Sequence, residues 1–192
     1  LWAASESGRL CRLTLDGEVE DLTTGPALWA LAQAPDGAVY AAGSGGRILP
    51  VRDGALQADD APLHRKRVVA AVPLADGLAS VDWSGRVIRW TPEGQGALLA
   101  ELGVIAESMA AWGADHLVVG TRKGLRVLRR SDGAVVAQGE DRADEIAVQG
   151  DRLADDDGDT ITYTVEWEDG VYVPREPPPE EQLEVELFDF DE

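Results

Sequence analysis

An internal repeat of roughly 40 residues constrains this chain more than any other feature of its sequence. The N-terminal segment LWAASESGRL aligns without a gap with VYAAGSGGRI at 39–48 and with LASVDWSGRV at 78–87. LVVGTRKGLR at 117–126 fits the same frame, and RLADDDGDTI at 152–161 fits it loosely. The alignment produces a column of turn residues with steps of 38, 39, 39 and 35: Gly8, Gly46, Gly85, Gly124 and Asp159.

A second turn column follows the first in every repeat. It consists of an acidic residue followed by glycine, and its glycines are separated by 37, 40, 39 and 37 residues. Its members are Asp16-Gly17, Asp53-Gly54, Glu93-Gly94, Asp132-Gly133 and Asp169-Gly170. Two turn columns that advance together indicate duplicated structural units.

Short apolar or alternating runs lie between the turns, as in RVIRW at 86–90, and no window has a sustained helical stripe. Each repeat therefore predicts four short strands, which is the blade of a β-propeller. The predicted fold class is all-β, a propeller of four-stranded antiparallel blades with about four and a half blades present. We expect blades to end near residues 26, 65, 105, 142 and 174, followed by an acidic tail at 175–192.

Two segments carry a family resemblance that covers most of the chain. WALAQAPDG at 29–37 resembles the "ALAFSPDG" segment of WD-repeat blades, and RVIRW at 86–90 resembles their "TVRLWD" segment. The Gly-His and Trp-Asp dipeptides of that family are absent, since Trp90 precedes Thr91, so the sequence does not establish the buried hydrogen-bond network that they build. DGAVV at 132–136 also resembles quinoprotein propeller repeats.

The repeat frame places Leu1 inside the second strand of a blade. We therefore expect the C-terminal part of a larger propeller of about seven blades, with an upstream segment or another chain completing it. The alternative is a small propeller closed by its own C-terminus.

The composition limits the classes of binding partner and the cellular location that we expect. A formal net charge of −19 disfavours nucleic acid and anionic membrane surfaces and favours solubility and a basic partner. The single cysteine, Cys11, excludes an internal disulfide and is expected in the core. Without 18 consecutive apolar residues, no membrane span is expected. The bias toward Ala, Gly, Arg and Asp suggests a microbial source. A cytoplasmic location is expected.

No motif in the sequence indicates catalysis. His64 and His116 lie in different repeats and are expected to be surface or turn residues. There is no cluster of Cys and His with metal-ligand spacing, no phosphate-binding loop and no dinucleotide fingerprint. We therefore predict no catalytic residues, metal or cofactor, and a non-enzymatic protein-interaction scaffold. The alternative is an enzyme or a quinoprotein-like ligand-binding domain with its site at the central channel.

The turns between second and third strands are the predicted partner-binding face. Arginine and tryptophan, which are enriched at binding hot spots, gather there and could receive an acidic peptide or a phosphate-bearing group. The candidate residues are Arg9, Arg47, Trp83, Arg86, Arg122 and Lys123. The alternative is that Gly-Arg is hairpin chemistry repeated by duplication. The basic segment at 64–67 is a second candidate, or a solvated connection between blades.

The tail combines acidic and large apolar residues after a stiff PPP spacer at 177–179. Leucine and valine alternate with glutamate, the period of a half-buried strand, and two phenylalanines follow. The candidate docking residues are Leu183, Val185, Leu187, Phe188 and Phe190. The tail is expected to dock on a partner, to complete an open edge of the propeller, or to act as a disordered solubilising end.

Overall fold

A computed structural model describes residues 1–34, 37–57 and 63–140, together with four strands at 146–149, 152–155, 165–168 and 171–174. The three-stranded first blade contains β1 (Trp2–Ala4), β2 (Arg9–Leu13) and β3 (Val19–Thr24). The second blade contains β4 (Leu28–Gln33), β5 (Val39–Gly43), β6 (Ile48–Arg52) and β7 (Ala55–Leu56), with the short 3₁₀ helix η1 (Ser44–Gly46) between β5 and β6.

The third and fourth blades repeat this pattern. The third contains β8 (Val68–Leu74), β9 (Gly77–Asp82), β10 (Arg86–Trp90) and β11 (Gly96–Glu101). The fourth contains β12 (Ala106–Trp112), β13 (His116–Thr121), β14 (Gly124–Arg129) and β15 (Val135–Gln138). Two hairpins follow, β16 (Ile146–Gln149) with β17 (Arg152–Asp155), and β18 (Val165–Glu168) with β19 (Val171–Pro174).

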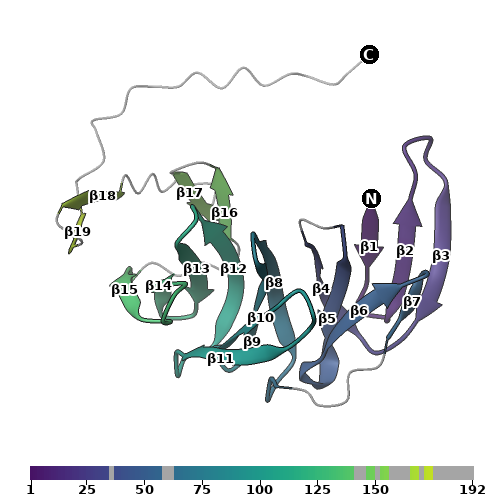
Figure 1. The fold of residues 1–192 in the computed structure, drawn as a ribbon, viewed down its shortest axis with the longest axis horizontal. Coiled ribbons are helices and arrows are strands. Elements are labelled where there is room, and N and C mark those ends of the chain that lie inside the picture. Colours follow the sequence, from purple (N-terminus) through teal and green to yellow (C-terminus); the bar gives the residue numbers. More distant parts are fainter. Residues whose placement is uncertain are drawn as a thin grey trace.

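Every strand pair is antiparallel, and each sheet follows the chain order, so each blade is a simple meander. The sheets lie side by side in chain order, from β1–β3 at one end of an arc to β16–β17 at the other (Figure 1). The first strand of each blade is the innermost, because β4 contacts β8, β8 contacts β12, and β12 contacts β16. The predicted all-β architecture of four-stranded antiparallel blades is confirmed.

The first turn column is a requirement of the backbone. Gly8, Gly46, Gly85 and Gly124 all have positive φ, between 69° and 94°. A Cβ at any of them would also lie 2.0–2.4 Å from a carbonyl oxygen of the segment that leads to the next blade. For Gly85 that oxygen belongs to Val104. These turns therefore hold each blade against its connection to the next, and only glycine fits there.

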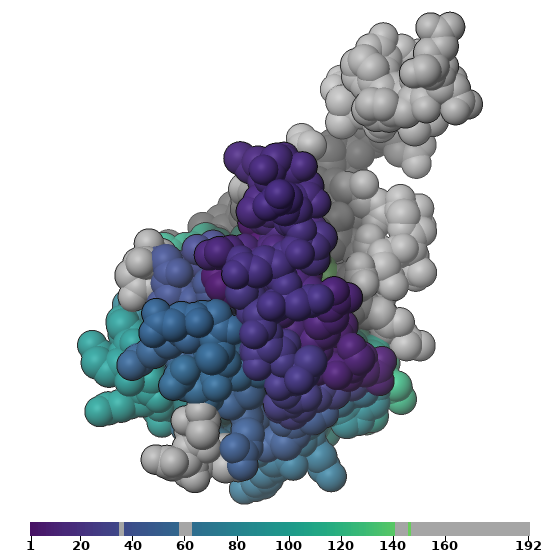
Figure 2. Space-filling view, turned by 90° about the vertical axis from the view of Figure 1, so that its right-hand side faces the viewer, coloured from purple at the N-terminus to yellow at the C-terminus, as the bar shows by residue number. Residues whose placement is uncertain are grey.

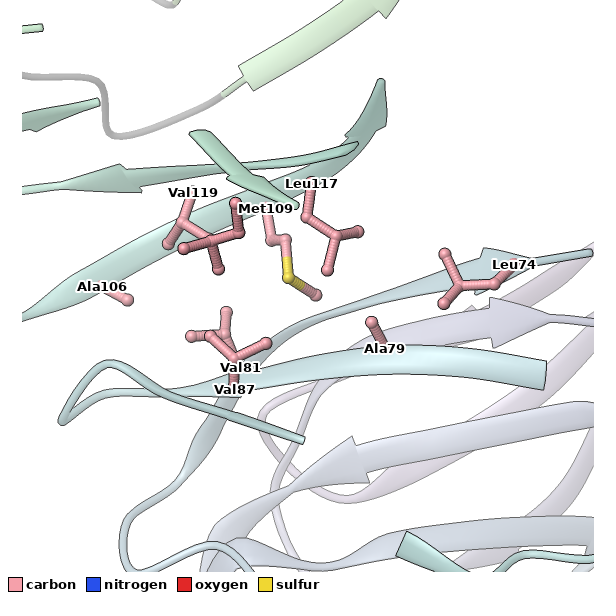
Figure 3. Close-up of a cluster of buried hydrophobic side chains, with 9 residues drawn as sticks. Leu74, Ala79, Val81, Val87, Ala106, Met109, Leu117 and Val119 are labelled. Carbon is pink, nitrogen blue, oxygen red and sulfur yellow. The ribbon is translucent and has the colours of Figure 1, made fainter. Parts of the chain in front are cut away.

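The core is divided into layers between neighbouring blades. Figure 3 shows Val81 and Val87 of the third blade facing Ala106 and Met109 of the fourth. Along β10 the side chains alternate, so that Val87 packs toward the fourth blade and Ile88 toward the second. Cys11 is buried as expected. Each blade is therefore stabilised mainly through its neighbours.

The first blade lies at one end of the arc. Its outer side is turned to the viewer in purple in Figure 2, beside the second blade in blue. Between these two blades, Leu10 packs with Leu28 and Ala41.

Candidate functional site

A buried polar network in the third blade supports the candidate face. His64, expected to be a surface or turn residue, has only 4% of its surface exposed, and that expectation is wrong. Its Nε2 lies 2.6 Å from Ser80 Oγ, which also accepts a hydrogen bond of 2.7 Å from Trp90 Nε1. Its Nδ1 lies 3.5 Å from Asp82 Oδ2. A tautomer with its proton on Nδ1 suits both contacts, because Ser80 can then donate to Nε2.

Asp82 connects this network to two backbone segments. Its Oδ1 accepts hydrogen bonds from the backbone N–H and hydroxyl of Ser84, at 2.8 and 2.6 Å, and from the N–H of Arg86 at 3.1 Å. Its Oδ2 accepts from the N–H groups of Arg65 and Lys66, at 3.0 and 3.3 Å. The carboxylate therefore fixes the β9–β10 turn and the basic connection before β8 to each other.

These contacts change the pKa of the Asp82 carboxyl. Burial acts to raise it, but His64, the Ser84 hydroxyl and two backbone N–H groups outweigh that effect and hold the pKa well below its ordinary value. Asp82 is thus a buried anion whose oxygens are fully used by the blade.

The buried network forms although the Gly-His and Trp-Asp dipeptides are absent. Leu63 precedes His64 and Thr91 follows Trp90, and the side chains of His64 and Trp90 both contact Ser80 Oγ. Two sequence features could have predicted this network. One is a histidine four residues before an innermost strand, and the other is a Ser-x-Asp segment at the end of the next strand.

A ladder of stacked cations and indoles crosses the same face. The Arg67 guanidinium lies over the Trp29 ring, 4.6 Å from its centroid, and over the Trp83 ring, 4.4 Å from its centroid. The Arg122 guanidinium lies 4.9 Å from the Trp83 centroid. We call these four residues the Trp–Arg ladder. It joins the second, third and fourth blades through cation–π contacts.

The backbone places the ladder. The N–H of Trp83, in the β9–β10 turn, donates to the carbonyl oxygen of Arg67 at 2.9 Å. The N–H of Arg122, in the β13–β14 turn, donates in the same way to Ile105 at 3.1 Å. Each turn is therefore held next to the start of its own blade's innermost strand.

A hollow of about 290 Å³ opens beside the ladder, lined by Trp29, Arg67, Val69, Trp83 and Glu107. Trp29, Val69 and Glu107 each occupy the second position of an innermost strand, in β4, β8 and β12. The hollow thus lies along the inner edge of three successive blades. The Trp29 indole N–H is buried without an acceptor among the described residues.

The structure brings together two of the six predicted site residues, Trp83 and Arg122, and places the exposed Lys123 beside them. It adds Arg67 from the basic segment, together with Trp29 at the second position of β4. Both depend on contacts between blades, which the repeat pattern does not specify.

The other three arginines are engaged elsewhere. Arg9 forms an ion pair with Asp21. Arg47 lines a separate hollow with Leu49 and Leu56. The side chain of Arg86 is only 16% exposed and is paired with Glu101. The tail residues Leu183, Val185, Leu187, Phe188 and Phe190 lie outside the described residues.

Comparisons with known proteins address the fold. No protein-family model and no curated protein matches the chain. The β-propeller domain of Cps50 (Swd1) from Myceliophteria thermophila is similar to it with 15% identity and a TM-score of 0.57, over 79% of this chain and 60% of that one. The WD40 β-propeller domain of Doa1 is similar with 16% identity and a TM-score of 0.63, over 82% of this chain and 58% of that one. The chain has a WD40-like β-propeller fold.

The propeller spans about 60% of the length of these two domains. Within its described residues, no group of three or more His, Cys, Asp or Glu side chains is arranged to hold a metal ion. That part of the propeller also has no helix long and apolar enough to cross a membrane.

Proposed function

We propose that the propeller is a non-enzymatic scaffold that binds a protein partner on the face carrying the β9–β10 and β13–β14 turns. The Trp–Arg ladder is the observation that supports this most strongly. Trp83 and Arg122 belong to the residue types that dominate binding hot spots, and both are at least partly exposed. The network around Asp82 fixes the β9–β10 turn that carries Trp83, which lowers the entropic cost of binding there.

The charge of the face supports a protein partner over a polyanion. Five cations outnumber three carboxylates on this face of a chain whose net charge is −19. The cations are Arg65, Lys66, Arg67, Arg122 and Lys123, and the carboxylates are Asp82, Glu101 and Glu107. Such a patch can attract a short acidic surface, while the whole molecule repels nucleic acid and anionic membranes. We propose a cytoplasmic setting and no nucleic-acid or membrane partner.

The acidic C-terminal tail is proposed as a second docking element. Its alternating leucine and valine residues, followed by Phe188 and Phe190, suit addition as a strand to a partner's sheet or recognition as an acidic-aromatic motif. It would leave the ladder free for another partner.

Affinity purification of the tagged protein from its native cells, with quantitative mass spectrometry, tests the proposed face. We expect Lys123→Glu and Trp83→Ala to lower the recovered amount of a specific partner at least tenfold. The matched control is Arg52→Glu, a charge reversal at the exposed β6–β7 turn on the opposite face. If both face variants retain every partner that the wild type captures, the proposal is wrong.

A further inference from the structure

We propose that the hollow beside Arg67 is a binding site for a carboxylate side chain of an acidic partner segment. This inference rests on the proposed function and specifies the chemistry of the partner. It concerns Arg67 and Trp29, which the predicted partner-binding set did not include.

The guanidinium of Arg67 is held by two indole rings. Its Cζ atom lies over the Trp29 ring, 4.6 Å from the centroid, and over the Trp83 ring, 4.4 Å from the centroid. Among the residues that the structure describes, none forms a hydrogen bond or ion pair with this guanidinium. Neighbouring arginines differ, since Arg86 is paired with Glu101 and Arg122 with Glu107.

Contact with the two indoles does not replace the hydrogen bonds that the guanidinium can make. Its N–H donors lie in one plane and form a fork. A planar fork of donors matches a carboxylate, which it binds with two parallel hydrogen bonds. The stacking also fixes the side chain beforehand, which reduces the entropy lost when a ligand binds.

The hollow has the size and lining for one side chain. Its volume of about 290 Å³ lies at the lower end of ligand pockets, so it suits a side chain better than a nucleotide-sized molecule. Trp29, Trp83 and Val69 would contact the methylene groups of an aspartate or glutamate.

The acid in the lining does not oppose this ligand strongly. Glu107 is largely buried and its Oε1 accepts a hydrogen bond of 2.8 Å from Arg122 Nε, so Arg122 offsets its negative charge. The exposed Lys66 and Lys123 add positive charge on the same face.

The test is a titration of the protein with an acetylated and amidated hexaglutamate peptide, with hexaglutamine as the neutral control, at about 0.15 M salt. Nuclear magnetic resonance would follow the Arg67 Nε–H and the indole N–H signals of Trp29 and Trp83. We expect saturable shifts of these signals with hexaglutamate and none with hexaglutamine. The absence of a saturable Arg67 shift would overturn the proposal.

Substitutions test whether Arg67 is the residue that binds hexaglutamate. We expect Arg67→Gln to weaken hexaglutamate binding about tenfold or more, and Arg67→Lys to weaken it severalfold because lysine lacks the planar fork. Arg89→Gln removes the same charge from an arginine paired with Asp76, so it is the matched control and should change affinity by less than twofold. Equal loss in Arg67→Gln and Arg89→Gln would overturn the proposal. If Arg67→Gln does not fold, the wild-type Arg67 shift alone decides.

The two proposals can fail separately. If Trp83→Ala and Lys123→Glu lose their protein partner but hexaglutamate does not use Arg67, the binding face stands and the carboxylate site is wrong. If hexaglutamate binds at Arg67 but the face variants keep all partners, the carboxylate site stands and the proposed function is wrong.

Discussion

Asp82 is the residue on which the polar network of the third blade depends, because it accepts hydrogen bonds from both segments that meet on the candidate face. Its side chain is fully buried, so removing the charge leaves several donors without an acceptor. We expect Asp82→Asn to lower the free energy of unfolding by about 2–3 kcal/mol at neutral pH, measured by urea denaturation. Asp115→Asn, at an exposed turn, is the control and should change it by less than about 0.5 kcal/mol.

The same variant should change the acid dependence of stability. The folded pKa of Asp82 lies below its ordinary value of 3.8, so the unfolded state binds more protons between the two values. The stabilisation by Asp82 is therefore fully present above pH 3.8 and is lost as the pH falls toward the folded pKa. The difference between the wild type and Asp82→Asn should shrink below pH 3.8. A constant difference down to pH 2 would contradict this account of Asp82.

At the residue scale, the sequence predicted some residues of the candidate face and missed others. Trp83 and Arg122 were predicted at the face from their place in the turn column, and the structure stacks them together. His64 was misjudged because its partners, Ser80 and Asp82, are 16 and 18 residues away and meet it only when the blade is folded. A pattern based on adjacent dipeptides does not reveal contacts of this range.

At the scale of elements, the two turn columns make different demands on glycine. Gly85 has positive φ, and its Cβ would lie 2.4 Å from the Val104 carbonyl oxygen. Gly94 also has positive φ, but nothing lies within 4 Å of its Cβ position. Gly94→Ala carries only the cost of its backbone conformation, whereas Gly85→Ala also forces two blade segments apart.

We therefore expect Gly85→Ala to destabilise the protein by about 3 kcal/mol or more and Gly94→Ala by about 1 kcal/mol. Thermal unfolding followed by circular dichroism measures both. Equal losses would mean that the close approach at Gly85 relaxes without cost.

Strands and turns were the part of the fold that the sequence predicted best. The periodic glycines indicated both turn columns, and Gly8, Gly46, Gly85 and Gly124 all have the predicted turn conformation. The pairing of strand faces between blades, such as Val87 with the fourth blade and Ile88 with the second, required the structure. Alternation shows that two faces exist, but not which neighbour each face meets.

At the scale of the whole molecule, self-repulsion is the dominant electrostatic feature. The chain carries 36 acidic and 17 basic residues, and several ion pairs such as Arg9–Asp21 are exposed and contribute little. Raising sodium chloride from about 0.02 to 0.5 M should screen the repulsion and stabilise the fold by ~1 kcal/mol, roughly 2–4 °C in Tm. Differential scanning calorimetry measures this. A lower Tm in high salt would mean that the ion pairs outweigh the repulsion.

We expect the propeller to act through the face that carries the ladder. Site-specific photo-cross-linking tests this, with benzoylphenylalanine at position 66 on that face or at position 93 in the β10–β11 turn on the opposite face. Lys66 and Glu93 are both exposed, so the two sites are comparable. We predict that position 66 cross-links a specific protein in native cells, that position 93 does not, and that Trp83→Ala abolishes the cross-link. A specific cross-link from position 93 with none from position 66 would mean that the propeller binds its partner through the other face.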